Sequence, residues 1–396
     1  MKKRIFLYIV TLTLSVLYIV GGNFLAGYDS SQNPNADDTE YLKAKVVSVD
    51  SAKVSEMMHS SDKVYMQTDV TFTAEVLTGE MKGERLTAYQ TVSDYASVKK
   101  KQVEAGDKRI LINSEYNLGE QASEASGNRW FFAEYARSDA MIGLGLLFVF
   151  SVLFFGRGKG INTIISLALT CLAVISVHIP AVLAGKNIYL WTAITCVYMI
   201  VMTLTLVNGY SKKTLAAVLG CIGGVAISAI LCVIMQKLIF LTGFVDEQEV
   251  FLLNLNPQKP IDLVGVVYSA ILIGAVGAIM DVSVDISSSL AELSRKVGKV
   301  PFGDMFSSGI RIGRDIMGTM ANTLVLAYIG SSLCTVLLLA AYNTSVLYLF
   351  NMENIVIELL QSLVGSLGIL FCIPLTAAVS SFIYNRDTSK TEWFMK

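Results

Sequence analysis

Residues 277–293 read GAIMDVSVDISSSLAEL, a stretch that begins as lipid-soluble sequence and then carries carboxylates. Asp281 and Asp285 are four residues apart, and Glu292 follows seven residues later. On an α-helix these three acids share one face with small residues that precede them, Ala270, Gly274 and Gly277. Small residues let a second helix approach closely, and the acids would then face it. The stretch therefore predicts a membrane helix with one polar side.

The composition of the chain is that of a membrane protein. Of its 396 residues, 53% are hydrophobic and only 16% are charged. Apolar runs of about 20 residues are what a helix needs to cross roughly 30 Å of hydrocarbon. The formal net charge of −1 gives no sign of a nucleic-acid partner. The partner that the sequence predicts first is the lipid bilayer.

We expect a polytopic α-helical membrane protein with about eight transmembrane helices. The basic start MKKR precedes an apolar run longer than the 7–15 residues of a cleaved signal peptide, so residues 1–27 are interpreted as a retained signal-anchor helix. A seven-helix membrane domain is expected at 138–384, and a cytoplasmic tail at 385–396. Its spans are expected at roughly 138–156, 161–183, 187–208, 214–241, 261–283, 314–341 and 355–384.

Residues 28–137 form a separate, acidic segment with 18 acidic and 13 basic residues. After a polar linker, DSSQNPNADD, short alternating runs such as KAKVVSVD and ERLTAYQTVSD are separated by turns that contain Gly or Asp. This pattern predicts a small β-rich domain, a barrel or sandwich of OB-like type, between the first two helices.

The distribution of basic residues predicts the orientation. If the N-terminus is cytoplasmic, the inside segments hold 15 Lys and Arg residues, whereas the outside loops hold only Lys186, Lys237 and Lys259. Such a bias satisfies the positive-inside rule. Both termini are therefore expected inside, and the β-rich domain outside.

Catalytic and metal-binding motifs are missing from the sequence. All six cysteines lie in apolar runs, and the two histidines, His59 and His178, are far apart. None of the motifs G-x-x-x-x-G-K-[ST], G-x-S-x-G, H-E-x-x-H or C-x-x-C occurs. We therefore expect no enzyme activity, no metal and no cofactor.

The candidate site lies where two expected helices carry polar residues. Asp281 lies 20 residues after Ile261, about 30 Å along a helix, so it falls near the inner edge of the hydrocarbon. Three interpretations stay open for Asp281 and Asp285: a cytoplasmic helix extension, a cation or proton site, or a structural ion pair. Their expected partners are in the next helix, which contributes Arg311, Arg314, Asp315 and Asn322. Glycines expected to pack helices closely are Gly274, Gly277, Gly318, Gly365 and Gly368.

Three blocks resemble the YibE/F family of bacterial multispan membrane proteins: GAIMDVSVDISSSLAEL, SGIRIGRDIMGTMANTLVLAYIGSS (308–332) and QSLVGSLGILFCIPLTA (361–377). The resemblance covers about residues 140–384 and implies a predicted permease of the bacterial cytoplasmic membrane, without a defined substrate. It places Asp281, Arg314, Asp315, Gly318, Thr319 and Asn322 in the most recognisable segments, and it assigns none of them a role.

Two functions of different classes remain. The first is a secondary transporter of an unknown small solute or ion, with Asp281, Asp285, Arg311, Arg314, Asp315 and Asn322 as its coupling or substrate site. The second is a non-transporting scaffold or sensor whose outer domain binds an envelope ligand or a protein. Polar residues at membrane depth favour transport, whereas the separate outer domain favours the scaffold.

Overall fold

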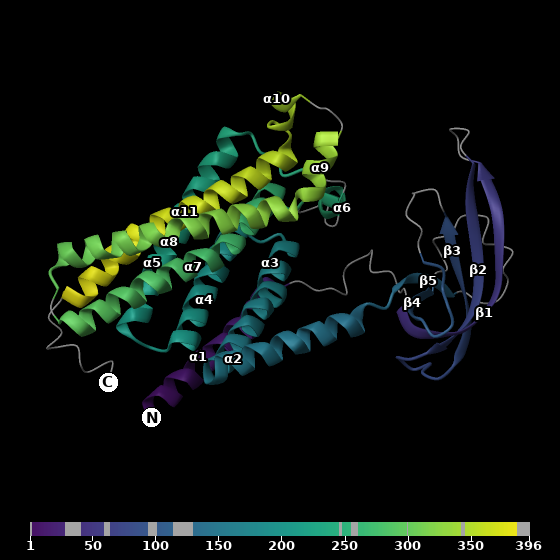
Figure 1. The fold of residues 1–396 in the computed structure, drawn as a ribbon, viewed down its shortest axis with the longest axis horizontal. Coiled ribbons are helices and arrows are strands. Elements are labelled where there is room, and N and C mark those ends of the chain that lie inside the picture. The colour runs from purple at the N-terminus through teal and green to yellow at the C-terminus, as the bar shows by residue number, and fades with distance from the viewer. Residues whose placement is uncertain are drawn as a thin grey trace. The chain divides into compact units, whose positions relative to one another are not determined.

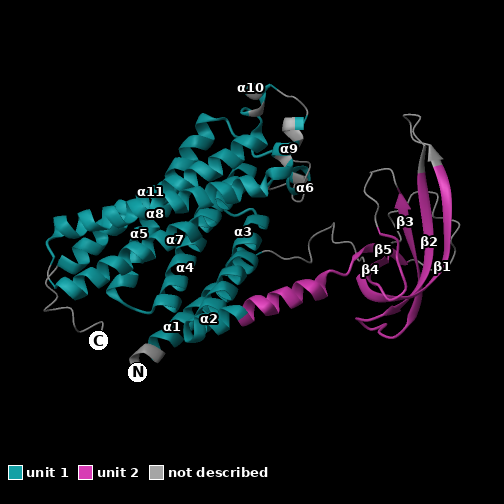
Figure 2. Cartoon of the chain, in the orientation of Figure 1, with its two compact units in different colours: residues 1–30, 151–396 teal, residues 31–150 magenta. Residues whose placement is uncertain are grey.

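The computed structural model describes residues 2–27, 41–58, 64–93, 101–113, 130–244, 248–254, 260–298, 300–341 and 345–385. The expected linker and nearly all of the expected C-terminal tail lie outside these residues. The chain divides into two compact units, residues 1–30 with 151–396 and residues 31–150 (Figure 2). Each unit is described by itself.

The smaller unit contains a closed five-stranded barrel (Figure 1). Its strands are β1 (Tyr41–Met58), β2 (Val64–Val76), β3 (Arg85–Ser93), β4 (Lys108–Asn113) and β5 (Trp130–Tyr135). They follow the order β1-β2-β3-β5-β4, in which β3 and β5 pair in parallel and the other described pairs are antiparallel. This connectivity is that of an OB-like barrel, as the alternating sequence predicts. The quoted runs did not include β5.

Alternation of side chains along the strands builds the barrel core. Alternate residues point to opposite faces of a strand, and β2 buries Val70, Phe72, Ala74 and Val76 in this way. Beyond Lys45 the described pairing of β1 is with β2 alone, and it continues to Met58 opposite Val64. The two strands therefore extend as a ribbon beyond the part of the barrel that β4 closes.

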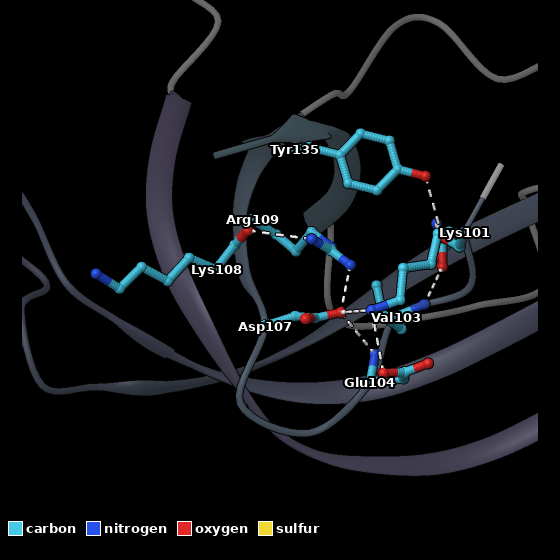
Figure 3. A network of polar contacts seen from close by, with 8 residues as sticks. Lys101, Val103, Glu104, Asp107, Lys108, Arg109 and Tyr135 are labelled. Atoms are coloured by element: carbon cyan, nitrogen blue, oxygen red, sulfur yellow. Dashed lines mark hydrogen bonds and ion pairs between the residues drawn. The ribbon is translucent and has the colours of Figure 1, made fainter. Parts of the chain in front are cut away.

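A polar network fastens the segment before β4 to the barrel (Figure 3). Arg109, 6% exposed, pairs with Asp107 and lies over the ring of Tyr135 at 4.6 Å. The Tyr135 hydroxyl donates to the carbonyl of Lys101 at 3.1 Å. The hydrogen bond of Lys101 with Glu104, followed by the charge of Asp107, raises the pKa of the Lys101 ammonium. A buried guanidinium is thus satisfied by a carboxylate and an aromatic face.

The larger unit is helical, with α1 (Lys2–Ala26) and most of α2 (Ser138–Ala173) leading into a bundle. The remaining elements are η3 (Val174–His178), α3 (Ile179–Leu183), α4 (Ile188–Asn208), α5 (Lys212–Leu238), α6 (Gln248–Asn254), α7 (Leu263–Val297), α8 (Phe302–Ser331), α9 (Leu333–Ala341), α10 (Val346–Leu349) and α11 (Glu353–Asn385). Among the described residues, six helical stretches are long and apolar enough to cross a membrane.

Six stretches differ from the eight spans expected, and two features explain the difference. The expected spans 138–156 and 161–183 fall in a single 46-residue stretch, Ser138–Leu183. Arg157 breaks it with a left-handed backbone, φ 48°, and a Cβ at Gly160 would lie 2.4 Å from the Val152 carbonyl oxygen. The expected span 314–341 is divided between α8 and α9, and α8 is too polar to meet the criterion.

The N-terminal helix packs onto the bundle through one face. Tyr18 stacks on Tyr198 of α4 with ring centroids 4.0 Å apart, and its hydroxyl lies 3.1 Å from the Thr195 hydroxyl. One turn further on, a Cβ at Gly22 would meet Val177 of η3 at 2.7 Å. α1 therefore contributes specific contacts to the bundle as well as an apolar length.

Close glycine contacts hold the centre of the bundle together between α5 and α11. A Cβ on Gly220 would lie 2.0 Å from the Thr376 hydroxyl, and one on Gly224 would lie 2.8 Å from the Cβ of Cys372. From the other side, a Cβ on Gly368 would meet the Ser228 hydroxyl at 2.1 Å. We call these four helical turns the α5–α11 seam, defined by Gly220, Gly224 and Gly368. Small residues permit such close backbone approach in membrane bundles.

Candidate functional site

Helix α7 has two chemically different sides, and the difference answers why acids follow one face of it. Its buried side packs against α4, α5, α8 and α11. On that side the Ser283 hydroxyl donates to the Ala217 carbonyl at 2.7 Å and lies 2.9 Å from the Thr376 hydroxyl. Serine hydroxyls therefore link α7 to α5 and α11, and the carboxylates are absent from this side.

The carboxylates lie on the opposite, exposed side of α7. Asp281 and Asp285 are both exposed, one helical turn apart, and their like charges interact. A Cβ added to Gly277 on the same face would meet no atom within 4 Å. Asp281 lies 19 residues after the N-cap Asp262, about 28 Å along the helix. We call the exposed residues Gly277, Asp281 and Asp285 the α7 acidic face.

Helix α8 is divided in the same way. Its packed side uses Gly309, where a Cβ would lie 2.7 Å from Ala377, and Gly313, where it would lie 2.2 Å from Ile373. These contacts hold α8 against α11. The polar residues of the helix lie on the exposed side, which we call the α8 polar face: Arg311, Arg314, Asp315, Gly318, Thr319 and Asn322.

The two polar faces lie at matching distances from the connection between α7 and α8. Asp285 lies 12 residues before Val297, the end of α7, and Arg314 lies 12 residues after Phe302, the start of α8. Nevertheless, the ion pairs among the described residues include none that joins Asp281 or Asp285 to an arginine of α8. The glycines of α8 face α11, and this orientation directs Arg311 and Arg314 to the exposed side.

Further polar residues lie around Gly274, nearer the outer end of the two helices. A Cβ at Gly274 would meet the Tyr328 hydroxyl at 2.7 Å and the Gln361 amide nitrogen at 3.5 Å. Glu358, one turn before Gln361 on α11, interacts electrostatically with Tyr328. The sequence-based site did not include Tyr328 or Gln361. The signal was present, because Glu358, Gln361, Gly365 and Gly368 recur at helical spacing.

The glycines expected to pack helices have different surroundings. A Cβ at Gly365 would lie 2.8 Å from Leu324 and 3.5 Å from Ala275, so Gly365 and Gly368 both lie at tight contacts. Gly277 and Gly318 instead border open space, since an added Cβ there meets nothing within 4 Å. The tight contacts of Gly220 and Gly224 were not predicted.

A cavity of about 390 Å³ lies at the outer ends of α4, α5 and α7. Tyr189, Gln236 and Lys237 contribute the polar groups of its lining. Beside it, the Glu353 carboxylate accepts hydrogen bonds from the backbone N–H groups of Thr242 and Gly243 at 2.7 and 2.6 Å. This contact ties the start of α11 to the turn after α5.

The arrangement can bind and release cations or protons. Carboxylates on a spanning helix exchange such ions where water reaches them. Among the described residues, no group of three or more His, Cys, Asp or Glu side chains could hold a metal ion. The chemistry that these faces offer is therefore reversible ion binding by individual carboxylates.

Comparison with known proteins identifies the membrane part of the chain. The family model of the YibE/F-like protein matches residues 144–386, which include α7, α8 and α11. No curated protein and no solved structure matches the chain. The match covers more than half of the sequence and contains both polar faces, and the chain therefore belongs to the YibE/F-like family.

Proposed function

We propose that the protein is a secondary transporter that moves a small solute or ion and uses Asp281 as its coupling site. The observation that carries the proposal is the two-sided α7, an apolar spanning helix whose acids lie on the exposed side, opposite the serine contacts. Ionisable residues at membrane depth are costly and mark ion pathways or relays. A residue kept only for packing would have no reason to be a carboxylate there.

The proposed path follows the polar side chains of α7, α8 and α11. The outer cavity receives the solute or ion, and the groups around Gly274 form the next step. Asp281 and Asp285 then hold a cation or proton, and the arginines of α8 lie at the depth of Asp285. Like charges one turn apart favour holding a single cation or proton between them.

The same proposal includes eight membrane crossings. The 46 residues of Ser138–Leu183 extend about 69 Å, twice the thickness of the hydrocarbon, so the break at Arg157 allows two crossings. α8 with α9 supplies the remaining one. The excess of Lys and Arg in the inner segments places both termini in the cytoplasm of a bacterial cell and the barrel outside.

Reporter fusions test this topology. Fusions at residues 80 and 250 are expected to report the outside, and fusions at 159, 212, 297 and 394 the inside. An inside result at residue 80 would reverse the proposed orientation, because the barrel separates the first two crossings. Opposite locations at 80 and 159 require one crossing between them, which distinguishes eight crossings from six.

Proton flux in proteoliposomes tests the transport proposal. The purified full chain is reconstituted with trapped pyranine, and pulses of Na⁺, K⁺ or Mg²⁺ chloride are applied outside. We expect a cation-dependent change in internal pH that empty liposomes lack and that Asp281→Asn abolishes. The matched control is Glu292→Gln, which removes a carboxylate from the same helix, where it pairs with Arg295 and Lys296.

Two outcomes would overturn the transport proposal. Wild-type flux in Asp281→Asn would remove Asp281 from the coupling site. Flux no greater than in empty liposomes, for every cation of the panel, would reject cation-coupled transport.

The extended ribbon of the barrel favours the second function, a scaffold or sensor. β1 carries exposed apolar side chains at Val47, Val49 and Val54, where its described pairing is with β2 alone. An edge strand of this kind is a template for binding another strand. Deletion of residues 41–137 separates the two functions: flux that persists without the barrel supports transport as the role of the helices, and a deletion phenotype without loss of flux supports the scaffold.

A further inference from the structure

The α7 acidic face and the α8 polar face are unsuited to contact with lipid. Asn322, Asp281 and Arg314 are exposed in a single copy of the chain. In hydrocarbon, an amide or a charge without a partner is strongly disfavoured. The exposed sides of α4 and α11, by comparison, present apolar residues such as Leu190 and Leu363. The α7 and α8 faces therefore require a polar cover that the described part of one copy does not supply.

The two faces complement each other in charge. The α7 acidic face carries Asp281 and Asp285, and the α8 polar face carries Arg311 and Arg314 together with Asp315. Each face also has a glycine in open space, Gly277 and Gly318. Opposite charges flanking small residues are the features of a close interface between membrane helices.

A two-fold axis along the membrane normal would bring these faces together twice. Rotation about that axis preserves depth, so Asp285 of one copy meets the depth of Arg314 in the second copy. The same contact then recurs with the roles exchanged, as in every isologous interface. Both copies would cover their charges in a single step.

We infer that a second copy of this chain covers the α7 acidic face with its α8 polar face, and that the protein works as a two-fold dimer. The inference goes beyond the transport proposal and does not rest on it, because its test measures assembly and not flux.

Charge reversal in two differently tagged copies tests the dimer. Asp285→Lys alone places lysine against Arg314 in both contacts of a homodimer, and Arg314→Glu alone places glutamate against Asp285 in both. We expect either variant to lose self-association by about tenfold or more, since like charges across an interface are strongly unfavourable. When the two variants are co-expressed, one contact is Lys–Glu and the other is Asp–Arg, so the mixed dimer should recover. Pull-down through one tag measures all three combinations.

Lys159→Glu is the matched control, because it reverses an exposed charge on α2, away from α7 and α8. It should associate with itself as the wild type does. Unchanged association of the single variants, or no gain on mixing, would overturn the inference. Mixing also excludes pairing within one chain, because such pairing could not be restored by a second copy.

Cysteine cross-linking provides a measurement that tolerates no misfolding artefact. The exposed native cysteines are first replaced by Cys171→Ser and Cys334→Ser. Copies with Gly277→Cys are then co-expressed with copies that carry Gly318→Cys, and native membranes are oxidised. We expect a covalent dimer in this mixture and none with Leu363→Cys, on the exposed apolar side of α11. A wild-type protein that stays monomeric in membranes by single-molecule photobleaching would reject the interface.

Discussion

The α5–α11 seam and the exposed faces of α7 and α8 are built from the same small residues, yet their surroundings differ. At Gly220 and Gly368 an added Cβ would lie about as close to a neighbouring hydroxyl as a covalent bond allows, 2.0 and 2.1 Å. At Gly277 and Gly318 it would meet no atom within 4 Å. In the first place glycine is required by contact within one chain, and in the second it leaves space beside charges.

Their polar residues differ in the same way. The seam region uses neutral hydroxyls, which can donate to a carbonyl of the neighbouring helix and so are satisfied within the bundle, as Ser283 is. The exposed faces use carboxylates, guanidinium groups and an amide, which one copy leaves uncovered. The comparison indicates that the seam maintains the fold and that the exposed faces carry the function, and four predictions test it.

The largest effect is expected from Gly220→Leu. The new side chain would collide with the backbone Cα of Thr376, 2.8 Å from the added Cβ, as well as with its hydroxyl. Overpacking against backbone cannot be relieved by a rotamer change, so we expect a loss of roughly 3 kcal/mol or more in the free energy of unfolding. Titration of the purified protein with SDS measures it. Gly318→Leu is the control and should leave the unfolding of a single copy unchanged; an equal loss in both variants would contradict the comparison.

The next effect concerns a charge that is buried and satisfied, in contrast to those of α7. Arg109→Met removes the guanidinium that joins Asp107 to the barrel. Because a hydrogen bond to a charged group is lost, we expect residues 28–137 expressed alone to lose about 1.5–3 kcal/mol of stability toward urea. The wild-type domain should be monomeric with a β-rich circular dichroism spectrum. A helical spectrum, or an unchanged urea midpoint for the variant, would contradict the role of this network.

A smaller effect is expected from Ser283→Ala. The variant loses the hydrogen bonds to Ala217 and Thr376 but keeps the packing of the helix. Hydrogen bonds between membrane helices average about 0.6 kcal/mol and reach about 1.7 kcal/mol. We expect a loss in this range during SDS unfolding, and none for Ser289→Ala on the exposed side of α7. Equal effects of the two changes would show that the two sides of α7 do not differ in this way.

Hydrophobic pattern and charge predict much of this architecture, and packing decides the rest. The barrel follows from alternation and the helices from apolar length, whereas β5 is short and far in sequence from its partner β4. The face of α7 follows from residue spacing alone, so Asp281 and Asp285 could be identified. Which glycine is pressed and which is open depends on the neighbouring helix, and for that reason Gly220 was missed and Gly318 was expected at a helix contact. The direction in which α8 turns Arg314 likewise depends on α11.

The smallest effect on stability, and the most informative, is expected from Asp281→Asn. In one copy this carboxylate is exposed and has no described ion pair, so its loss should change the free energy of unfolding by less than about 0.5 kcal/mol. A pair with Arg314 inside one chain would behave differently, because removing either charge from a buried pair costs about 3–5 kcal/mol and removing both recovers much of it. SDS unfolding of Asp281→Asn, Arg314→Gln and the double variant, each at a dilution that leaves single copies, distinguishes the two cases. Three silent variants support open faces that a second copy covers. A large loss in the single variants with recovery in the double variant would place the pair within one chain, and the acids of α7 would then belong to the packing that the seam represents.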